Sequence, residues 1–175
     1  MKARDLILVT SIVMGLEFVA AIPAHAARCL PDTFLTIRSE SLAIDEQPGS
    51  TGRNGIAISE AELLALPIHT ITTTTEWTPL SRFDGPLLSD VLALARVRGK
   101  SIRLFALDNY SVTIPWSDMN RYGIILAHSQ NGTRLTKRTF GPLFLMYPRD
   151  RYPSVLDTPT GTEKFIWQVC GIHVQ

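Results

Sequence analysis

Short runs of strand-forming residues, each closed by turn residues, follow one another along most of this sequence. In the clearest run, residues 68–75, every residue except His69 is β-branched. β-Branched side chains favour strands because they pack well on a pleated surface and lose rotamer freedom in a helix. The sequence has no internal repeat, so we expect the strands to assemble into the sheets of one compact unit.

A few helical patterns interrupt the strands. A helix is predicted to begin at Pro86 and to end just before Gly99, because apolar residues recur at helical spacing between them. A shorter helix is expected behind the capping box of Ser59 and Glu62, and one helical turn at residues 117–122. Further strands are expected at residues 34–37, 102–107, 111–115, 124–127, 142–147 and 165–170, and loops or turns at residues 46–55, 81–86 and 149–163. The predicted fold class is α+β with a mainly β core.

The first 26 residues have the pattern of a secretory signal peptide. Lys2 and Arg4 precede a mostly apolar run, and residues 24–26, Ala-His-Ala, fit a small-x-small cleavage site. The apolar run is interrupted and is shorter than the roughly 20 residues that a membrane-spanning helix needs. We expect cleavage near Ala26, which leaves residues 27–175 as a single exported, periplasmic domain that does not span the membrane. An uncleaved membrane anchor is the alternative.

The charge of the chain limits the classes of partner. The formal net charge is +1, and the signal peptide contains as many acidic as basic residues. Because no basic stripe is present to neutralise phosphates, no nucleic acid is expected as a partner. His69, His128 and His173 lie far apart without metal-ligand spacing, and no phosphate loop, zinc motif or serine-hydrolase elbow is found.

Two cysteines, Cys29 and Cys170, lie near opposite ends of the mature chain. Exported chains meet an oxidising compartment, so we predict a disulfide between them. It would close a long loop and stabilise the fold by about 3–5 kcal/mol in the chain-entropy model. The alternative is a free, buried Cys170 in the last strand. Neither cysteine has a histidine nearby, so thiol catalysis is not expected.

Four segments occur in an order that characterises one family. They are residues 83–92 (FDGPLLSDVL), 108–115 (DNYSVTIP), 125–135 (ILAHSQNGTRL) and 141–148 (GPLFLMYP), followed by Trp167 in the closing strand. In this order they resemble the helix start, hairpin and turns of the molybdopterin-binding domain of the sulfite oxidase family. Turn and packing requirements explain most of these residues, so the resemblance indicates fold more than function.

The resemblance also draws attention to a missing residue. Enzymes of the family hold a molybdenum–pterin cofactor through one cysteine thiolate, but no cysteine lies between Cys29 and Cys170, and Trp77 stands roughly in the region of that ligand. A thiolate is a soft metal ligand, whereas an indole offers a π-face. The chain resembles small exported, cysteine-less versions of the fold. This implies a free pterin as ligand and, as partner, an inner-membrane signalling enzyme that makes or degrades cyclic di-GMP.

A pterin site needs a stacking surface, a carboxylate to accept from the 2-amino group and N3–H, and an arginine for the 4-oxo group or a phosphate. The candidate ligand-binding residues are Trp77 and Tyr147 for stacking, with Trp116 as a further ring, Asp84 and Asp108 as acceptors, and Arg82, Arg134 and Arg138 as donors. Each also has an ordinary explanation: a core ring, an aspartate that bonds its own turn, or a solvated basic face. Arg82 is the favoured arginine because it adjoins the loop after Trp77.

These observations predict a non-catalytic pterin-binding protein with no metal and no tightly bound cofactor. A bound pterin would order the loops around Trp77 and Arg82 and thereby change the affinity for the partner. Two alternatives remain. One is a molybdopterin-dependent oxidoreductase that uses another metal ligand or a terminal cysteine. The other is an interaction module with an empty pocket.

Overall fold

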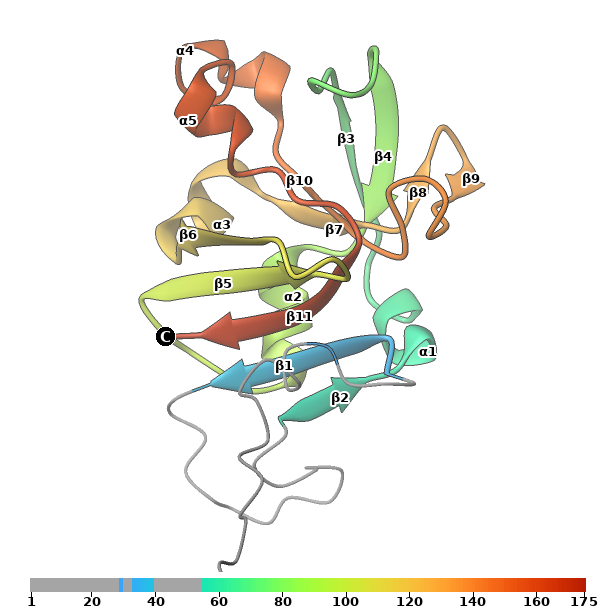
Figure 1. The fold of residues 1–175 in the computed structure, drawn as a ribbon, viewed down its shortest axis with the longest axis vertical. Coiled ribbons are helices and arrows are strands. Elements are labelled where there is room, and N and C mark those ends of the chain that lie inside the picture. Colours follow the sequence, from blue (N-terminus) through green and yellow to red (C-terminus); the bar gives the residue numbers. More distant parts are fainter. Residues whose placement is uncertain (1–28, 30–32, 40–54) are drawn as a thin grey trace, which may run out of the picture.

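The computed structural model describes residue 29 and residues 33–39 and 55–175. These residues form three β-sheets with short helices around them (Figure 1). The mainly β, α+β fold predicted from the sequence is confirmed. The predicted signal peptide and most of the loop predicted at residues 46–55 lie outside the described residues. In the described part of the chain, none of the helices combines the length and the apolar character needed to cross a membrane.

The largest sheet has five strands in the order β2-β1-β11-β5-β6. β1 and β11 run parallel, whereas the other neighbouring pairs are antiparallel. β11 is the last strand in the sequence, yet it lies in the middle of the sheet. The strands are β1 (Leu35–Ser39), β2 (Ile56–Ile58), β5 (Ser101–Ala106), β6 (Ser111–Pro115) and β11 (Val169–Val174).

Two smaller sheets complete the strand framework. A four-stranded sheet has the order β3-β4-β8-β9, and β7 pairs with β10 in a two-stranded sheet. The β3–β4 hairpin projects from the body of the molecule (Figure 1). The strands are β3 (His69–Thr73), β4 (Ser81–Gly85), β7 (Ile125–Ala127), β8 (Ser129–Gln130), β9 (Thr133–Arg134) and β10 (Phe144–Met146).

The helices are short. The expected capping box is present, because Ser59 and Glu62 exchange hydrogen bonds at the start of α1. α2 lies behind the five-stranded sheet in Figure 1 and buries Leu88, Val91 and Leu92. The helical elements are α1 (Glu60–Leu64), α2 (Leu88–Leu94), α3 (Ser117–Tyr122), η3 (Arg149–Arg151), α4 (Pro153–Leu156) and α5 (Pro159–Thr162).

The core fills the space between the sheets and α2. Phe83 of β4, Phe144 of β10 and Tyr147 are among its largest fully buried side chains. Gly85 is required where β4 crosses β7, because a Cβ added there would lie 2.1 Å from the carbonyl oxygen of Leu126. The close approach of these two backbones sets the base of the β3–β4 hairpin.

Four predicted elements are wrong or displaced. The helix expected to run up to Gly99 ends at Leu94. Residues 81–86 were expected to turn, but most of them form β4, which pairs with β3 on one side and β8 on the other. Residues 149–163 contain three short helical elements rather than a loop. The closing strand begins at Val169 instead of Phe165, because Gln168 adopts a φ of 56° that interrupts an extended run.

Candidate functional site

The tip of the β3–β4 hairpin places Trp77 at the surface. The hydroxyl of Thr75 accepts the backbone N–H groups of Trp77 at 3.1 Å and Thr78 at 3.0 Å, and this fixes the turn. The Trp77 side chain packs edge-on against Trp167, with ring centroids 4.5 Å apart. Trp77 nevertheless remains 41% exposed, so part of its indole is open to a ligand.

A charged cluster adjoins this tip. Arg149 binds the carboxylate of Glu76 at 2.8 Å and also binds Asp157. Its side chain is 13% exposed, and its Nε is buried without a hydrogen-bond partner among the described residues. The two carboxylates are 49% and 57% exposed, so both can still accept hydrogen bonds from a ligand.

Asp150 ties this cluster to the hairpin. Its carboxylate accepts the Thr74 backbone N–H at 2.9 Å and the Thr74 hydroxyl at 2.6 Å, while its own N–H donates to Thr73. Burial acts to raise the pKa of Asp150, but these hydrogen bonds and the charge of Arg149 together outweigh burial and lower it. The carboxylate is therefore held in its charged form, which keeps η3 against the end of β3.

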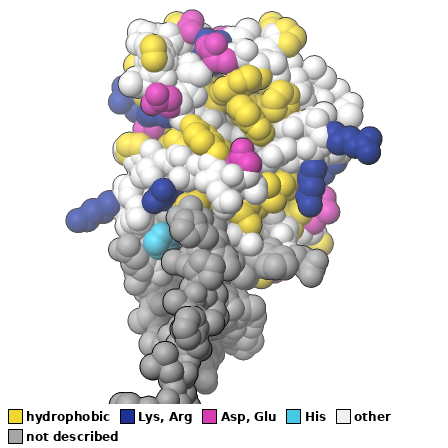
Figure 2. All heavy atoms as spheres, in the orientation of Figure 1, with side chains coloured by type: hydrophobic (Ala, Val, Ile, Leu, Met, Phe, Trp, Pro, Cys, Tyr) yellow, Lys and Arg dark blue, Asp and Glu magenta, His cyan; other side chains and the backbone are white. Residues whose placement is uncertain are grey.

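We call the residues Trp77, Glu76, Arg149 and Asp157 the Trp77 site. Two of these residues, Glu76 and Asp157, line a pocket of about 360 Å³ together with Thr158, Pro159 and Thr162. Figure 2 shows hydrophobic side chains gathered on the upper part of the face in view, the part of the molecule where Figure 1 places the β3–β4 hairpin. The site thus combines an exposed aromatic ring, two carboxylates and a guanidinium group, drawn from the hairpin tip and the α4–α5 segment.

A second hollow lies between β1, α1 and the loop after β9. This groove has a volume of about 710 Å³, and we call it the Arg134 groove. Arg134 pairs with Glu60 at 2.5 Å and lies over the ring of Phe34 at 6.0 Å. Its other lining residues are Cys29, Thr33, Leu107, Leu135, Thr136, Lys137, Pro142 and Cys170.

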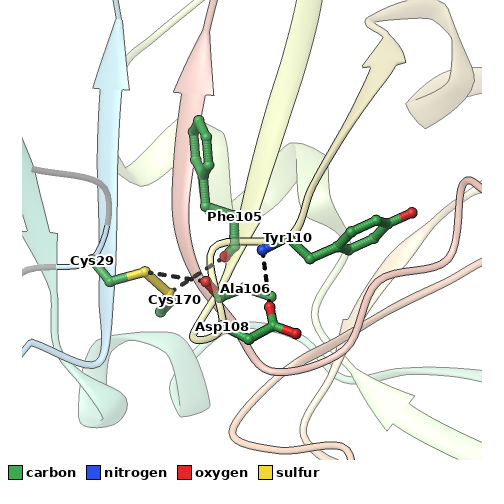
Figure 3. The surroundings of a disulfide bond; sticks show 6 residues. All are labelled: Cys29, Phe105, Ala106, Asp108, Tyr110 and Cys170. Atoms are coloured by element: carbon green, nitrogen blue, oxygen red, sulfur yellow. Dashed lines mark hydrogen bonds between the residues drawn. A yellow bond between two sulfur atoms is a disulfide. The ribbon is translucent and has the colours of Figure 1, made fainter. Parts of the chain in front are cut away.

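Cys29 and Cys170 form the predicted disulfide, which borders the Arg134 groove (Figure 3). The two sulfur atoms lie 3.8 Å and 3.4 Å from the backbone carbonyl oxygens of Ala106 and Phe105. The bond joins the chain before β1 to β11 across a sequence separation of 141 residues. Both cysteines of the sequence are engaged in it, so neither sulfur is available as a thiolate.

His128 is buried between β7 and β8. It is 8% exposed, and neither ring nitrogen has a hydrogen-bond partner among the described residues. Burial lowers the pKa of His128, and the charge of Arg134 lowers it further, against the opposing effects of Asp84 and Glu60. The imidazole is therefore kept neutral.

The structure separates some of the predicted site residues. Arg82 binds Asp84 at 2.9 Å, and Thr70 donates to the same carboxylate at 2.6 Å. Side chains alternate along a strand, so this pair faces away from Phe83, which packs against Phe144 beside Trp77. Arg82 and Asp84 consequently lie on the opposite face of the hairpin from the rings around Trp77.

Other candidates have ordinary surroundings. Asp108 accepts the backbone N–H of Tyr110 at 2.9 Å and so shapes the β5–β6 turn (Figure 3). Arg138 is exposed in the loop between β9 and β10. Trp116 is partly buried against the core at the start of α3. Arg134 lines its groove and is already paired with Glu60.

The structure does not support the predicted stacking role of Tyr147. We expected it to stack on a ligand, but its side chain is 0% exposed. Its hydroxyl donates to Asp118 at 3.0 Å, and its ring packs against Tyr122 and Phe165. With no exposed π-face, Tyr147 supports the core instead of binding a ligand.

Sequence reasoning missed most of the Trp77 site. Glu76 adjoins Trp77 in the sequence and could have been named from that position alone. Arg149 and Asp157 lie in a segment that we expected to be a polar loop, and no local pattern connects them to the hairpin. Trp167 was expected in a strand, and its contact with Trp77 depends on the tertiary fold.

Comparison with known proteins agrees with this architecture. Residues 68–150 match the family described as oxidoreductase molybdopterin binding domain. No curated protein matches the sequence. Among solved structures, the sulfane dehydrogenase SoxCD from Paracoccus pantotrophus is similar, with a TM-score of 0.58 and 19% identity. The match covers 82% of this chain and 38% of that chain, so the likeness concerns the fold of one part of the larger protein. This chain therefore has the fold of the sulfite oxidase-type molybdopterin-binding domain.

Proposed function

We propose that this protein is an exported, periplasmic, non-catalytic pterin-binding protein. It binds the pterin ring without molybdenum at the Trp77 site, and its ligand state modulates an inner-membrane enzyme that makes or degrades cyclic di-GMP. The observation that carries the proposal is the partly exposed Trp77 ring at the hairpin tip, next in the chain to Glu76, whose carboxylate shares Arg149 with Asp157.

The metal half of the family's cofactor does not fit the donors in this structure. The family holds molybdenum through a cysteine thiolate, whereas both cysteines here are joined in a disulfide. Within residues 29, 33–39 and 55–175, no three His, Cys, Asp or Glu side chains lie together in a group that could hold a metal ion. Carboxylate, guanidinium and indole groups suit an organic ring better than a soft metal.

The pterin half fits the chemistry of the Trp77 site. The exposed part of the indole offers a face for stacking. Glu76 and Asp157 can accept hydrogen bonds from the 2-amino group and N3–H, because each keeps exposed oxygen surface beside its bond to Arg149. The Nε–H of Arg149, which has no partner among the described residues, is a further donor that a carbonyl oxygen could use if the side chain moved.

Ligand binding at this position can change the affinity of the protein for a partner. The site draws residues from the hairpin tip and from the α4–α5 segment, which are connected by Arg149 and Asp150. A ring held between them favours one relative position of the two segments. A partner that binds this arrangement more tightly is then recruited or released by the ligand.

The test is a ligand and metal assay on protein purified from its native periplasm. After denaturation, released small molecules are identified by fluorescence and mass spectrometry, and molybdenum is counted in parallel. We expect a pterin and no molybdenum. Trp77→Ala should lose the pterin, whereas Leu80→Ala, which removes another exposed side chain near the same tip, should retain it. If Arg134→Gln abolishes binding and Trp77→Ala does not, the ligand lies in the Arg134 groove and the proposed site is wrong.

The family match favours one alternative function, a molybdopterin-dependent oxidoreductase. That function requires a metal ligand other than a cysteine thiolate. About one molybdenum per chain in the same assay would establish it and overturn the non-catalytic proposal. If neither pterin nor metal is found, and added pterin does not bind, the chain is an interaction module with an empty pocket.

A further inference from the structure

A groove between α2 and α3 contains a second set of groups suited to a ligand. We call it the Arg96 groove; its volume is about 490 Å³. Leu92, Val97 and Met119 supply buried apolar surface, and the Trp116 ring is partly buried beside them. The remaining lining residues are Ser89, Ala93, Arg96, Arg98 and Asn120.

The charge of this groove is not balanced by its surroundings. The side chains of Arg96 and Arg98 are exposed, and neither guanidinium group forms a hydrogen bond or ion pair with any residue that the structure describes. The described residues that line the groove include no carboxylate. Asp90, on the same helix as Ser89, lies outside the lining and is approached by the Ser89 hydroxyl at 3.5 Å. Two positive charges therefore border an apolar surface, and the described part of the chain supplies no counter-ion to either.

The backbone holds Arg96 in an unusual conformation. Arg96 follows the end of α2 with a φ of 52°, and its N–H donates to the carbonyl oxygen of Ala93 at 3.1 Å. Glycine is the usual residue at this position after a helix, because it adopts the left-handed region without steric strain. A glycine would satisfy the turn equally well, so folding does not require the arginine side chain here.

We propose that the Arg96 groove binds a small planar molecule that carries a carboxylate or phosphate. The planar body lies on the apolar floor and against the Trp116 ring, and the anionic group pairs with Arg96 and Arg98. Asn120 and Ser89 offer neutral hydrogen-bonding groups at the rim. The groove is lined by none of the residues of the Trp77 site, so this proposal and the proposed function can fail separately.

The experiment compares three probes with the same ring system: naphthoate, naphthyl phosphate and the neutral naphthylmethanol. Binding to nitrogen-labelled protein is followed through the indole N–H signals, with that of Trp116 assigned by Trp116→Phe. We expect the anions to shift the Trp116 signal and to bind about tenfold or more tightly than naphthylmethanol, because charged hydrogen bonds are the stronger ones. A preference between the two anions identifies the favoured acid group.

Variants separate binding from folding. Arg96→Gly suits the positive φ at this position, so the variant should keep the melting temperature of the parent. Its affinity for the two anionic probes should fall toward that for naphthylmethanol. Arg98→Gln should act in the same direction. Arg121→Gln is the matched control, since Arg121 is an exposed arginine of α3 outside the lining. Three results would each overturn the proposal: binding of both anions no tighter than that of naphthylmethanol, shifts confined to Trp77 or Trp167, or full affinity in both arginine variants.

Discussion

Tyr147 and Asp118 are joined inside the core, where the tyrosine hydroxyl donates a hydrogen bond of 3.0 Å to the aspartate Oδ2. Lys164 donates to the same oxygen at 2.7 Å and lies over the Tyr147 ring at 5.7 Å. Burial, and then the negative charge of Asp118, raise the pKa of Tyr147 far above its usual range. The cluster connects α3 and the end of β10 with the segment that leads into β11.

Removal of Asp118 should therefore destabilise the fold. Asp118→Ala leaves the Tyr147 hydroxyl buried and the Lys164 ammonium largely buried, both without an acceptor. We expect the free energy of unfolding to fall by about 3–5 kcal/mol, as for other broken buried pairs. Urea denaturation measures the loss. Glu163→Ala, at an exposed neighbouring position, should stay within about 0.5 kcal/mol of the parent, and a similar small effect for Asp118→Ala would contradict the argument.

His128 predicts a loss of stability in mild acid. Its pKa is lowered in the folded state by burial and by Arg134, whereas the unfolded chain has an ordinary histidine pKa of about 6.5. The unfolded state therefore binds more protons, and stability is full above about pH 6.5 and declines as the pH falls toward the folded-state pKa. Urea midpoints between pH 8 and about pH 5 follow this decline. His128→Gln should make the dependence of stability on pH weaker. If the dependence stays unchanged in this variant, groups other than His128 cause the loss of stability in acid.

The exposed Trp77 ring predicts a graded effect on ligand affinity. Trp77→Ala removes the stacking face and its apolar area, which together are worth about 1.5–3 kcal/mol, or roughly 10–100-fold in affinity. Trp77→Phe keeps a smaller ring and should lose less. Both variants should remain folded because the parent side chain is already 41% exposed. Titration of pterin fluorescence gives the affinities, and equal affinities for the Ala and Phe variants would rule out stacking.

The disulfide predicts a dependence of stability on redox conditions. The bond closes a loop with a sequence separation of 141 residues, and the chain-entropy model gives about 4–5 kcal/mol for a loop of this length. Cys29→Ala combined with Cys170→Ala should lower the free energy of unfolding by about that amount. Dithiothreitol should destabilise the parent and leave the double variant unchanged. An effect of the reductant on the double variant would show that it acts elsewhere.

Gly85 predicts a steric effect where β4 meets β7. Gly85→Ala would place a methyl group 2.1 Å from the carbonyl oxygen of Leu126, which is backbone and cannot rotate away. We expect a destabilisation of about 1–3 kcal/mol, the usual range for overpacking. Gly132→Asn is the contrasting change, because Gly132 has open space and a φ of 78°. In thermal denaturation, the melting temperature should fall clearly for Gly85→Ala and only slightly for Gly132→Asn.

Local signals in the sequence were sufficient for several elements. The capping box at Ser59 and Glu62 involves residues three apart, and the β5–β6 hairpin and the turn at Asn131 and Gly132 are equally local. β4 could not be recognised in this way. Its Ser, Asp and Gly residues are typical of turns, and it becomes a strand because β3 and β8 bind its two edges.

The candidate site shows the same limit. Trp77 and Glu76 could be selected from their own sequence region, but Arg149 and Asp157 come from a distant segment that η3 attaches to the hairpin. Arg82 and Asp84 were grouped with Trp77 because they are close in sequence. The alternation of a strand that was not recognised places them on the other face. Recognition of β4 would have corrected this error.

The position of β11 between β1 and β5 has a consequence for how the protein acquires its structure. Without residues 169–174 the largest sheet consists of two separate hairpin-like pairs, β1 with β2 and β5 with β6. The pairing of Thr36 with Gly171 joins segments from distant parts of the sequence, so the contact order is high and the sheet forms late. The two halves of this sheet therefore cannot be joined until residues 169–174 have been made.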